Sequence, residues 1–259
     1  MPLPTKAEIA TRKRHDRLMT LVEAGYIRAI VRAKNRYITR IAEAYKIGDG
    51  IPEYLTFEHS REMFALGNKY NSRIIKIIGR DVTENTIKNN NLCLETKQDA
   101  FDKWLALIIA SWINDETATA AQITAYTTRE DIRNAIRESF ENGESSASTV
   151  KRILKVKGLS AFRADVIART ETHNAAMFAN KEAGKRLSRD TGNVFNKVWV
   201  SVEDSRTRDS HRAMISHEAI NMESLFNVGG DRMDRPGDPR GSARNVINCR
   251  CTLAYRVAK

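Results

Sequence analysis

Residues 194 to 202 read Val-Phe-Asn-Lys-Val-Trp-Val-Ser-Val, and this stretch decides the fold class. Val198 and Val200 alternate with Trp199, which is the period of two expected of a strand. Residues 252 to 257 form a second such stretch and are a natural antiparallel partner for the first. The sequence before Val194 has helical periodicity instead. It therefore predicts an α+β protein, with a mostly helical N-terminal region followed by a C-terminal α+β domain that holds a small antiparallel sheet.

The N-terminal region is predicted to be a series of helices. Thr5 and Glu8 have the spacing of a capping box, in which each side chain satisfies the free backbone N–H of the other residue. Apolar residues then recur at helical spacing as far as Tyr45, and glycines end the helix at 48 to 50. A second helix is expected from Pro52 to Ile78, with Gly79 as its C-cap. A third covers Phe101 to Ile113, which is apolar almost all round and is therefore expected at the centre of a bundle. A fourth begins at Thr128 and ends at Asn142-Gly143, with Ile132, Ile136 and Phe140 facing inward.

The segment Glu144 to Ser148 is the most plausible hinge, and it divides the sequence into a helical region, 1–143, and an α+β domain, 149–259. A short helix is predicted to end at Gly158, and Ser160 is predicted to cap a longer helix. The stretch from Ser216 to Asn248 is rich in Gly, Pro and Asp and indicates a structured loop.

The composition excludes several classes of protein. The chain has 259 residues, a formal charge of +11 and three cysteines. An odd cysteine count argues against a disulfide framework and for a reducing compartment. No apolar run approaches the roughly 20 residues that span a bilayer. Cys93 is interpreted as an ordinary core residue.

The positive charge is concentrated at both ends of the sequence. Residues 1–40 hold ten basic against three acidic side chains, whereas residues 41–140 hold twelve against fifteen. A basic arm suggests a polyanionic partner, although a solvated helix face explains it equally well. The candidate contacts to DNA or a partner protein on this arm are Arg12, Lys13, Arg14, Arg28, Arg32, Lys34 and Arg36.

A charged cluster, residues 204 to 211, follows the first strand directly. Asp204 is placed to cap a following helix, and Asp209 is expected to pair with neighbouring arginines. The functional reading is a nuclease-like acid/base or metal site formed by Asp204, Asp209 and His211. A structural network that pins the loop is the favoured interpretation.

The segment Cys249-Arg250-Cys251 places two thiols on one face of a strand. Both could bind one zinc ion together with His211 and a fourth ligand, but the spacing is Cys-x-Cys and the sequence has no second cysteine pair. The favoured interpretation is two small buried thiols in the strand core. We therefore expect no metal and no other cofactor, with His211, Cys249 and Cys251 as the alternative zinc set.

Two further groups are less specific. Arg169-Thr170-Glu171 lies on a helix that also carries His173, and the 204–211 loop could supply partners to these residues if they are buried; surface ion pairing is the alternative. Pro236-Gly-Asp238-Pro239 is a turn signature without the spacing of a phosphate-binding loop.

These pieces together, in their order, resemble a known family. Ile167-Ala-Arg169-Thr170-Glu171-Thr-His173-Asn-Ala-Ala resembles the helix signature of the phage Mu F-like head morphogenesis, or minor head, proteins. Trp199 with Asp204-x-Arg206-Thr207-Arg208-Asp-Ser-His211 resembles the next block. Phe226-Asn-Val-Gly-Gly, then Pro236-Gly-Asp238, and finally Asn248-Cys249-Arg250-Cys251 resemble the closing block. The resemblance covers about residues 128 to 257.

The resemblance implies a non-enzymatic virion component of a tailed bacteriophage, located in the head interior or neck. It implies association with the portal protein or the major capsid protein, and a role in head morphogenesis with DNA retention or delivery. Contact with packaged double-stranded DNA is not implied directly. Some relatives carry a Cys-x-x-Cys and a His-Pro where this sequence has Arg208 with His211 and Val246-Ile247, and this departure weakens the zinc reading.

Overall fold

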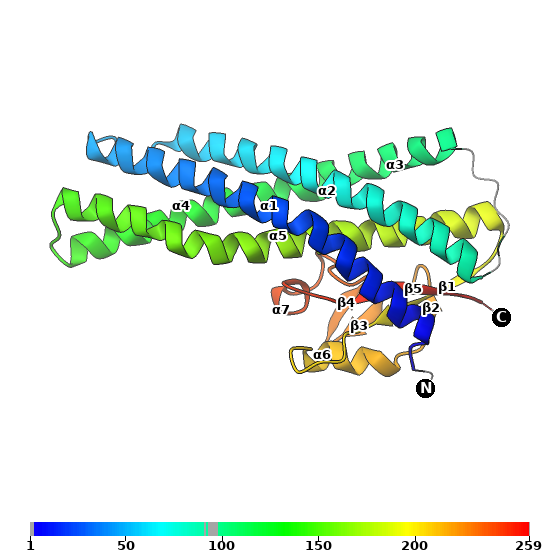
Figure 1. Ribbon diagram of the computed structural model, residues 1–259. Helices are drawn as coiled ribbons and strands as arrows, with labels where there is room; N and C mark the ends of the chain where they lie inside the picture. Colours follow the sequence, from blue (N-terminus) through cyan, green and yellow to red (C-terminus); the bar gives the residue numbers. More distant parts are fainter. Residues whose placement is uncertain (1–2, 91, 93–97, 259) are drawn as a thin grey trace. The chain divides into compact units, whose positions relative to one another are not determined.

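The computed structural model describes residues 3–90, 92 and 98–258, and in them helices predominate over five short strands (Figure 1). The long helices are α1 (Lys6–Lys46), α2 (Glu53–Asn89), α3 (Gln98–Trp112), α4 (Ala118–Glu141) and α5 (Ser146–Thr191), with a π-helical turn, Ile113–Thr117, between α3 and α4. The short helices are α6 (Asp209–Arg212), a 3-10 turn at Ala213–Ser216, and α7 (Ala243–Val246). The strands are β1 (Phe195–Val200), β2 (Ile220–Asn221), β3 (Phe226–Val228), β4 (Asp231–Met233) and β5 (Thr252–Val257). The predicted α+β class is confirmed.

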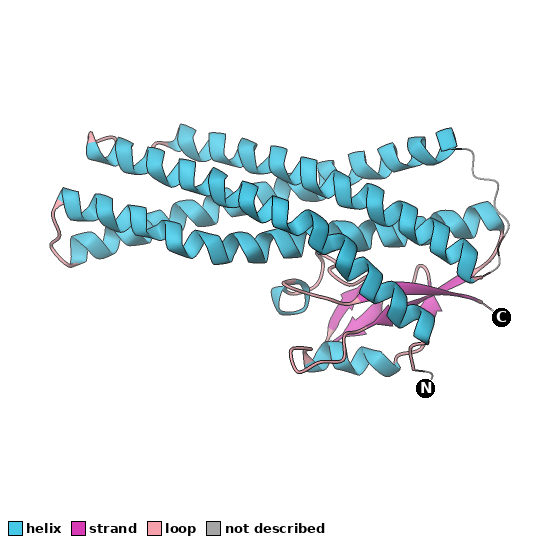
Figure 2. Ribbon diagram, viewed as in Figure 1, coloured by secondary structure: helices cyan, strands magenta, loops and turns pink. Residues whose placement is uncertain are grey.

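The chain forms two compact units, each assembled from separate stretches of sequence. The mixed unit consists of Met1–Val22, Asn71–Ser111 and Arg169–Lys259, and the helical unit consists of Glu23–Tyr70 and Trp112–Ala168. All the described strands belong to the mixed unit (Figure 2). The division of the sequence at 144–148 stays a prediction; in the structure, α4 ends at Glu141 and α5 begins at Ser146.

The mixed unit is organised around a three-stranded antiparallel sheet with the order β2-β1-β5. The pairing places Trp199 opposite Leu253 and Val198 opposite Ala254, as the alternation of the two stretches predicts. One face of the sheet buries Trp199 and Leu253 against Phe226 and other apolar side chains, and the other face buries Val198 with Ala254. The strands β3 and β4 form a hairpin whose turn residues, Gly229 and Gly230, both have positive φ, as a tight hairpin requires.

The beginning of α1 lies beside this sheet and is fixed by the predicted capping box (Figure 1). The Thr5 N–H donates to the Glu8 carboxylate at 2.7 Å, and the Glu8 N–H donates to the Thr5 hydroxyl at 3.3 Å. The same carboxylate accepts two hydrogen bonds from Arg256 on β5, at 2.7 and 2.9 Å. The capping residue therefore also joins the helix to the sheet.

Replacing Thr5 by alanine is expected to lower the free energy of unfolding by about 1 kcal/mol, because the N–H of Glu8 loses its acceptor. Urea denaturation followed by circular dichroism measures the change. The variant Thr20→Ala is a matched control, since the Thr20 hydroxyl is exposed and bonds only to the carbonyl of Asp16 within the helix. An equal effect of the two substitutions would remove the capping argument.

The helical unit has an apolar core formed by segments of four helices. One cluster groups Ile38, Ile41 and Leu55 with Ile132 and Ile153. A second cluster groups residues that include Tyr26, Ile30, Met63 and Ala164. The predicted stripe of α1 is thus confirmed as core within this unit. Among the described residues, no helix is both long and apolar enough to cross a membrane.

Several predicted helix boundaries are wrong. The helix α2 continues ten residues past Gly79, which is therefore not a C-cap. A β-carbon at Gly79 would lie 3.0 Å from Leu105, so the glycine permits the close approach of α3. The helix α5 runs unbroken through Gly158 and Ser160, since Ile153 and Ala164 on either side are both buried. The helix α4 begins at Ala118, and the Thr128 hydroxyl donates to the carbonyl of Thr124 inside it.

Predictions of burial also need correction. Leu107 on α3 is 71% exposed, so α3 is not apolar core on every side, and Phe140 on α4 is 70% exposed and does not face inward. Lys34 was assigned to the exposed basic face of α1, but its side chain is buried. Burial and the nearby charge of Arg163 lower the pKa of Lys34 to about 8, partly offset by Asp131. The predicted core residue Cys93 lies outside the described residues.

Candidate functional site

The helix that carries the first signature block is buried where it meets the approach to β5. His173 lies beneath the backbone of the Cys-Arg-Cys segment, and its Nε2 is 2.8 Å from the carbonyl oxygen of Cys251. The Thr170 hydroxyl accepts the backbone N–H of Asn248 at 3.2 Å. Burial lowers the pKa of His173, so its ring is neutral near pH 7. Arg169 is exposed and Glu171 is half-buried.

The loop between β1 and α6 is pinned by Asp204. Its carboxylate accepts two hydrogen bonds from Arg250, at 2.6 and 2.7 Å, and also bonds to the backbone N–H of Arg206 and the hydroxyl of Thr207. The bonds from Arg250 hold the pKa of Asp204 well below the usual carboxyl range. The residue at the N-cap of α6 is Arg208, so the prediction that Asp204 caps this helix is wrong. Asp204 instead ties the loop to the Cys-Arg-Cys segment.

The turn from Pro236 to Pro239 is built around a buried carboxylate. Asp238 is 1% exposed and accepts the backbone N–H groups of Asp234 at 2.6 Å and of Arg240 at 3.1 Å, together with the Arg240 guanidinium. Burial would raise the pKa of Asp238, but these hydrogen bonds lower it. A β-carbon on Gly237 would lie 2.4 Å from the side chain of Asn174, so the turn rests directly on the signature helix α5. The signature blocks therefore meet in one network inside the mixed unit.

Three buried side chains with metal-binding chemistry meet within this network. The ligand atoms of His211, Cys249 and Cys251 all lie within 4.8 Å of one another, and no other such group of His, Cys, Asp or Glu occurs among the described residues. His211 Nδ1 is 3.3 Å from the sulfur of Cys251 and 3.7 Å from that of Cys249. Both thiols are free and buried. They lie just before β5 rather than within it, so their predicted position on a strand is wrong although they do share a core.

The electrostatics of the two thiols are unequal. Burial would raise the pKa of Cys251, but hydrogen bonds from Cys249 and His211 hold it well below the usual cysteine range. The pKa of Cys249 is raised well above that range by burial and by its neighbour Cys251.

The residues of the nuclease hypothesis have different surroundings. His211 is 2% exposed and faces the two thiols, whereas the side chain of Asp209 is fully exposed and lies 4.0 Å from Arg212. Asp204 is engaged by Arg250. The described structure therefore does not group these three side chains as one set of acid/base or metal ligands.

The basic residues of α1 are also in varied surroundings. In the mixed unit, Arg14 is paired with Asp81 at 2.7 Å and Arg12 with Asp16 at 3.9 Å, while Lys13 is exposed. In the helical unit, Arg28 and Arg32 are exposed, Arg36 pairs with Glu62, and Lys34 is buried.

His15 is a buried polar residue of α1 that was not predicted from the sequence. His15 is fully buried in the mixed unit, with Nδ1 at 2.9 Å from the Thr252 hydroxyl and Nε2 at 3.1 Å from Asp81. It lies four residues before the buried Met19 on α1, so its place on the apolar face was the available signal.

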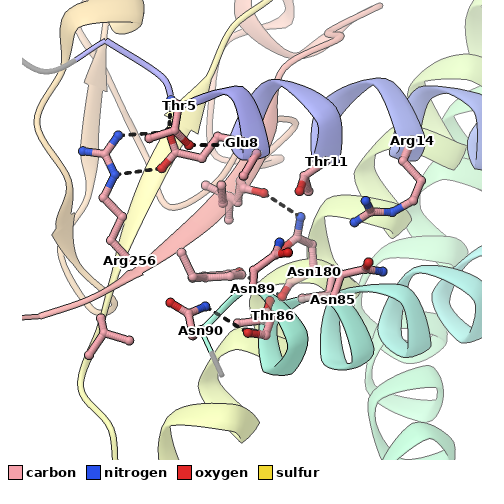
Figure 3. A pocket seen from close by; sticks show the side chains of 16 residues that line it. Thr5, Glu8, Thr11, Arg14, Asn85, Thr86, Asn89, Asn90, Asn180 and Arg256 are labelled. Carbon is pink, nitrogen blue, oxygen red and sulfur yellow. Dashed lines mark hydrogen bonds and ion pairs between the residues drawn. The ribbon is translucent and has the colours of Figure 1, made fainter. Parts of the chain in front are cut away.

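The mixed unit also contains a pocket of about 370 Å³ beside the capping box (Figure 3). Its amide-bearing walls come from the end of α2, with Asn85, Asn89 and Asn90, and from Asn180 on α5. The Asn180 amide donates to the carbonyl of Leu253 at 3.1 Å, and Glu8 and Arg256 close another side. This pocket was not predictable from the sequence, because its walls come from four elements far apart in the chain.

Comparisons with known proteins give two matches. Residues 130–254 match the family described as "Phage Mu protein F like protein". The chain is also similar to "Minor head protein GP7" of Bacillus phage SPP1, with 29% identity over 128 residues, which cover 49% of this chain and 40% of that protein. The matched region thus spans less than half of that relative. No solved structure gives a significant match.

Proposed function

We propose that the chain is a minor head protein of a tailed bacteriophage that acts in head morphogenesis, because residues 130–254 match the phage Mu F-like family. The observation that carries this proposal is the family match, supported by the likeness to a minor head protein over 128 residues. The geometry of the signature residues agrees with a structural role. Asp204 and His173 each hold one segment of the mixed unit against another, and Asp238 stabilises its own turn.

The proposed location is the virion, in the head interior or neck, with the portal protein or the major capsid protein as partner. The experiment is mass spectrometry of purified DNA-filled heads and of heads produced without this gene. We expect the chain in the former at low copy number, and a loss of infectious heads without it. Purified infectious heads that lack the chain would overturn the proposal.

A second role, contact with packaged DNA, is supported by the exposed Lys13, Arg28 and Arg32 on α1. Three phosphate contacts predict that affinity for duplex DNA falls by about 40-fold between 50 and 200 mM salt. Fluorescence anisotropy of the full chain with labelled duplex measures this dependence.

The matched variants separate the contribution of these three side chains from that of net charge. Reversal of Lys13, Arg28 and Arg32 to glutamate should abolish the binding. Reversal of the exposed Lys103, Lys151 and Lys155 changes the net charge equally and should leave most of it. Equal loss in both triple variants, or binding that salt does not weaken, would contradict a DNA-binding α1.

The same preparation tests the enzyme alternative. We propose a non-enzymatic role, so plasmid DNA should stay intact with magnesium, manganese or zinc. Cleavage that His211→Ala abolishes would restore the nuclease hypothesis in spite of the separate surroundings of Asp209 and His211.

A further inference from the structure

The cluster of His211, Cys249 and Cys251 has a chemistry that the proposed head-assembly role does not use. His211 lies on α6, and the two cysteines flank Arg250 directly before β5. The cluster therefore brings together two segments of the mixed unit that lie about 40 residues apart in the sequence. Each is at most 4% exposed. Thiolate sulfur and imidazole nitrogen are the ligands that zinc prefers in proteins.

The two nitrogen–sulfur distances within the cluster match edges of a zinc coordination tetrahedron, and all three ligand atoms lie within 4.8 Å of one another. With zinc–sulfur bonds of about 2.3 Å and a zinc–nitrogen bond of about 2.05 Å, tetrahedral angles place the nitrogen about 3.6 Å from each sulfur. The two nitrogen–sulfur distances in the structure are 3.3 and 3.7 Å. An ion bound between these atoms therefore requires shifts of only a few tenths of an ångström at the nitrogen–sulfur edges.

The charges also balance. A zinc ion bound by two thiolates and a neutral imidazole forms a group with no net charge, which removes the main cost of placing an ion in an apolar core. The surroundings are apolar, since Trp199, Met214 and Phe226 pack in the same cluster of side chains.

The ligands are held by contacts from outside the cluster. The ring of His211 meets Trp199 edge-on, with centroids 5.7 Å apart, and its backbone carbonyl accepts the Ser201 hydroxyl at 2.6 Å. The backbone of Cys251 is fixed by His173, and Arg250 is fixed by Asp204. Asn248, directly before Cys249, has a φ of 54°, a left-handed conformation that non-glycine residues rarely adopt. These supports orient the two thiols toward one imidazole.

We propose that His211 Nδ1, Cys249 Sγ and Cys251 Sγ bind one zinc ion, with a water molecule as the fourth ligand. Zinc then acts as a crosslink between α6 and the entrance to β5. Binding displaces any proton on each thiol to solvent, so that no redox step or further reactant is involved.

The first test uses the unmodified full chain. Protein expressed with zinc in the medium and dialysed against metal-free buffer should retain one zinc per chain by elemental analysis. X-ray absorption at the zinc edge should show two sulfur neighbours at about 2.3 Å and nitrogen or oxygen neighbours at about 2.0 Å. Substoichiometric zinc, or a shell without sulfur, would overturn the proposal and leave a hydrogen-bonded thiol–imidazole cluster.

The second test assigns the ligands. The variants Cys249→Ser, Cys251→Ser and His211→Ala should each lower zinc affinity by more than about 100-fold, since loss of a supporting residue alone costs 10–100-fold. Cys93→Ser is the matched control and should keep one zinc per chain. Cobalt substitution of the unmodified protein provides a readout that no variant needs: sulfur-to-cobalt charge-transfer absorption should appear. Unchanged affinity in all three variants, or cobalt binding without that absorption, would contradict the assignment.

Discussion

Replacing Asp234 by alanine is expected to lower the free energy of unfolding by about 3–5 kcal/mol, because it leaves a buried cation without its partner. The side chain of Lys197 on β1 is 0% exposed, and its ammonium group donates to the Asp234 carboxylate at 2.6 Å and to the Asp234 carbonyl at 2.8 Å. Lys181 on α5 bonds to the other carboxylate oxygen. Urea denaturation followed by tryptophan fluorescence measures the loss.

Two comparisons make this prediction specific. Asp209→Ala removes a fully exposed carboxylate and should change stability by less than about 0.5 kcal/mol. Adding Lys197→Met to Asp234→Ala removes the unpaired charge and should recover part of the loss. If the effects of the two substitutions simply add, the buried pair is not the cause.

The same pair makes stability depend on pH. Burial would raise the pKa of Asp234, but hydrogen bonds from Lys181 and Lys197 lower it below its unfolded value. A lowered carboxyl pKa contributes stability above the unfolded value of about 3.9, and this contribution is lost as the pH falls through the folded pKa. The difference in stability between the unmodified protein and Asp234→Ala should therefore shrink when the pH is lowered from 7 to 3. A constant difference across this range would contradict the assignment of charge to the pair.

The parts of the fold that depend on neighbouring residues were predictable from the sequence. The capping box of Thr5 and Glu8 and the alternation around Trp199 are set by backbone groups and side-chain period within a few residues. The same is true of the end of α4 at Gly143, where the positive φ of 62° lets the chain turn.

Glycine and lysine were misread where tertiary packing outweighed the local signal. Gly79 and Gly158 resemble helix ends in the sequence, but a glycine within a helix costs only about 1 kcal/mol, which the burial of neighbouring apolar residues exceeds. Lys34 was predicted on an exposed face, yet it lies four residues after Ile30 and four before Ile38, both buried, and therefore on the side of the helix that packs inside the helical unit.

The candidate site was predictable only in part for the same reason. The Cys-x-Cys spacing predicted two thiols on one face of a strand; both lie before β5 and are buried in one cluster of side chains. The approach of His211, about 40 residues earlier in the chain, depends on the route of the intervening loop and on the Trp199 ring, which no local pattern records. The contact of His173 with Cys251 depends equally on how α5 lies against β5.

Replacing Gly184 by alanine is expected to lower the free energy of unfolding strongly, because Gly184 lies where α5 packs closely against β5. A β-carbon at this position would lie 2.4 Å from Tyr255 Cζ and 2.6 Å from its Cε1. The ring cannot swing away freely, because its hydroxyl donates to the carbonyl of Asn180 at 2.9 Å and it packs edge-on against Phe195. Overpacking of this kind should cost about 3 kcal/mol, more than the roughly 1 kcal/mol that alanine gains over glycine in a helix.

A double-mutant cycle with Tyr255→Leu decides whether the ring is the cause. Tyr255→Leu removes the ring atoms that Gly184→Ala would meet, and it has a cost of its own from the lost packing. In that background Gly184→Ala should become neutral or stabilising, since only the helix preference remains. Thermal and urea unfolding of the four proteins measures the coupling. If Gly184→Ala costs the same with and without the ring, the close approach of α5 to β5 does not set the requirement for glycine.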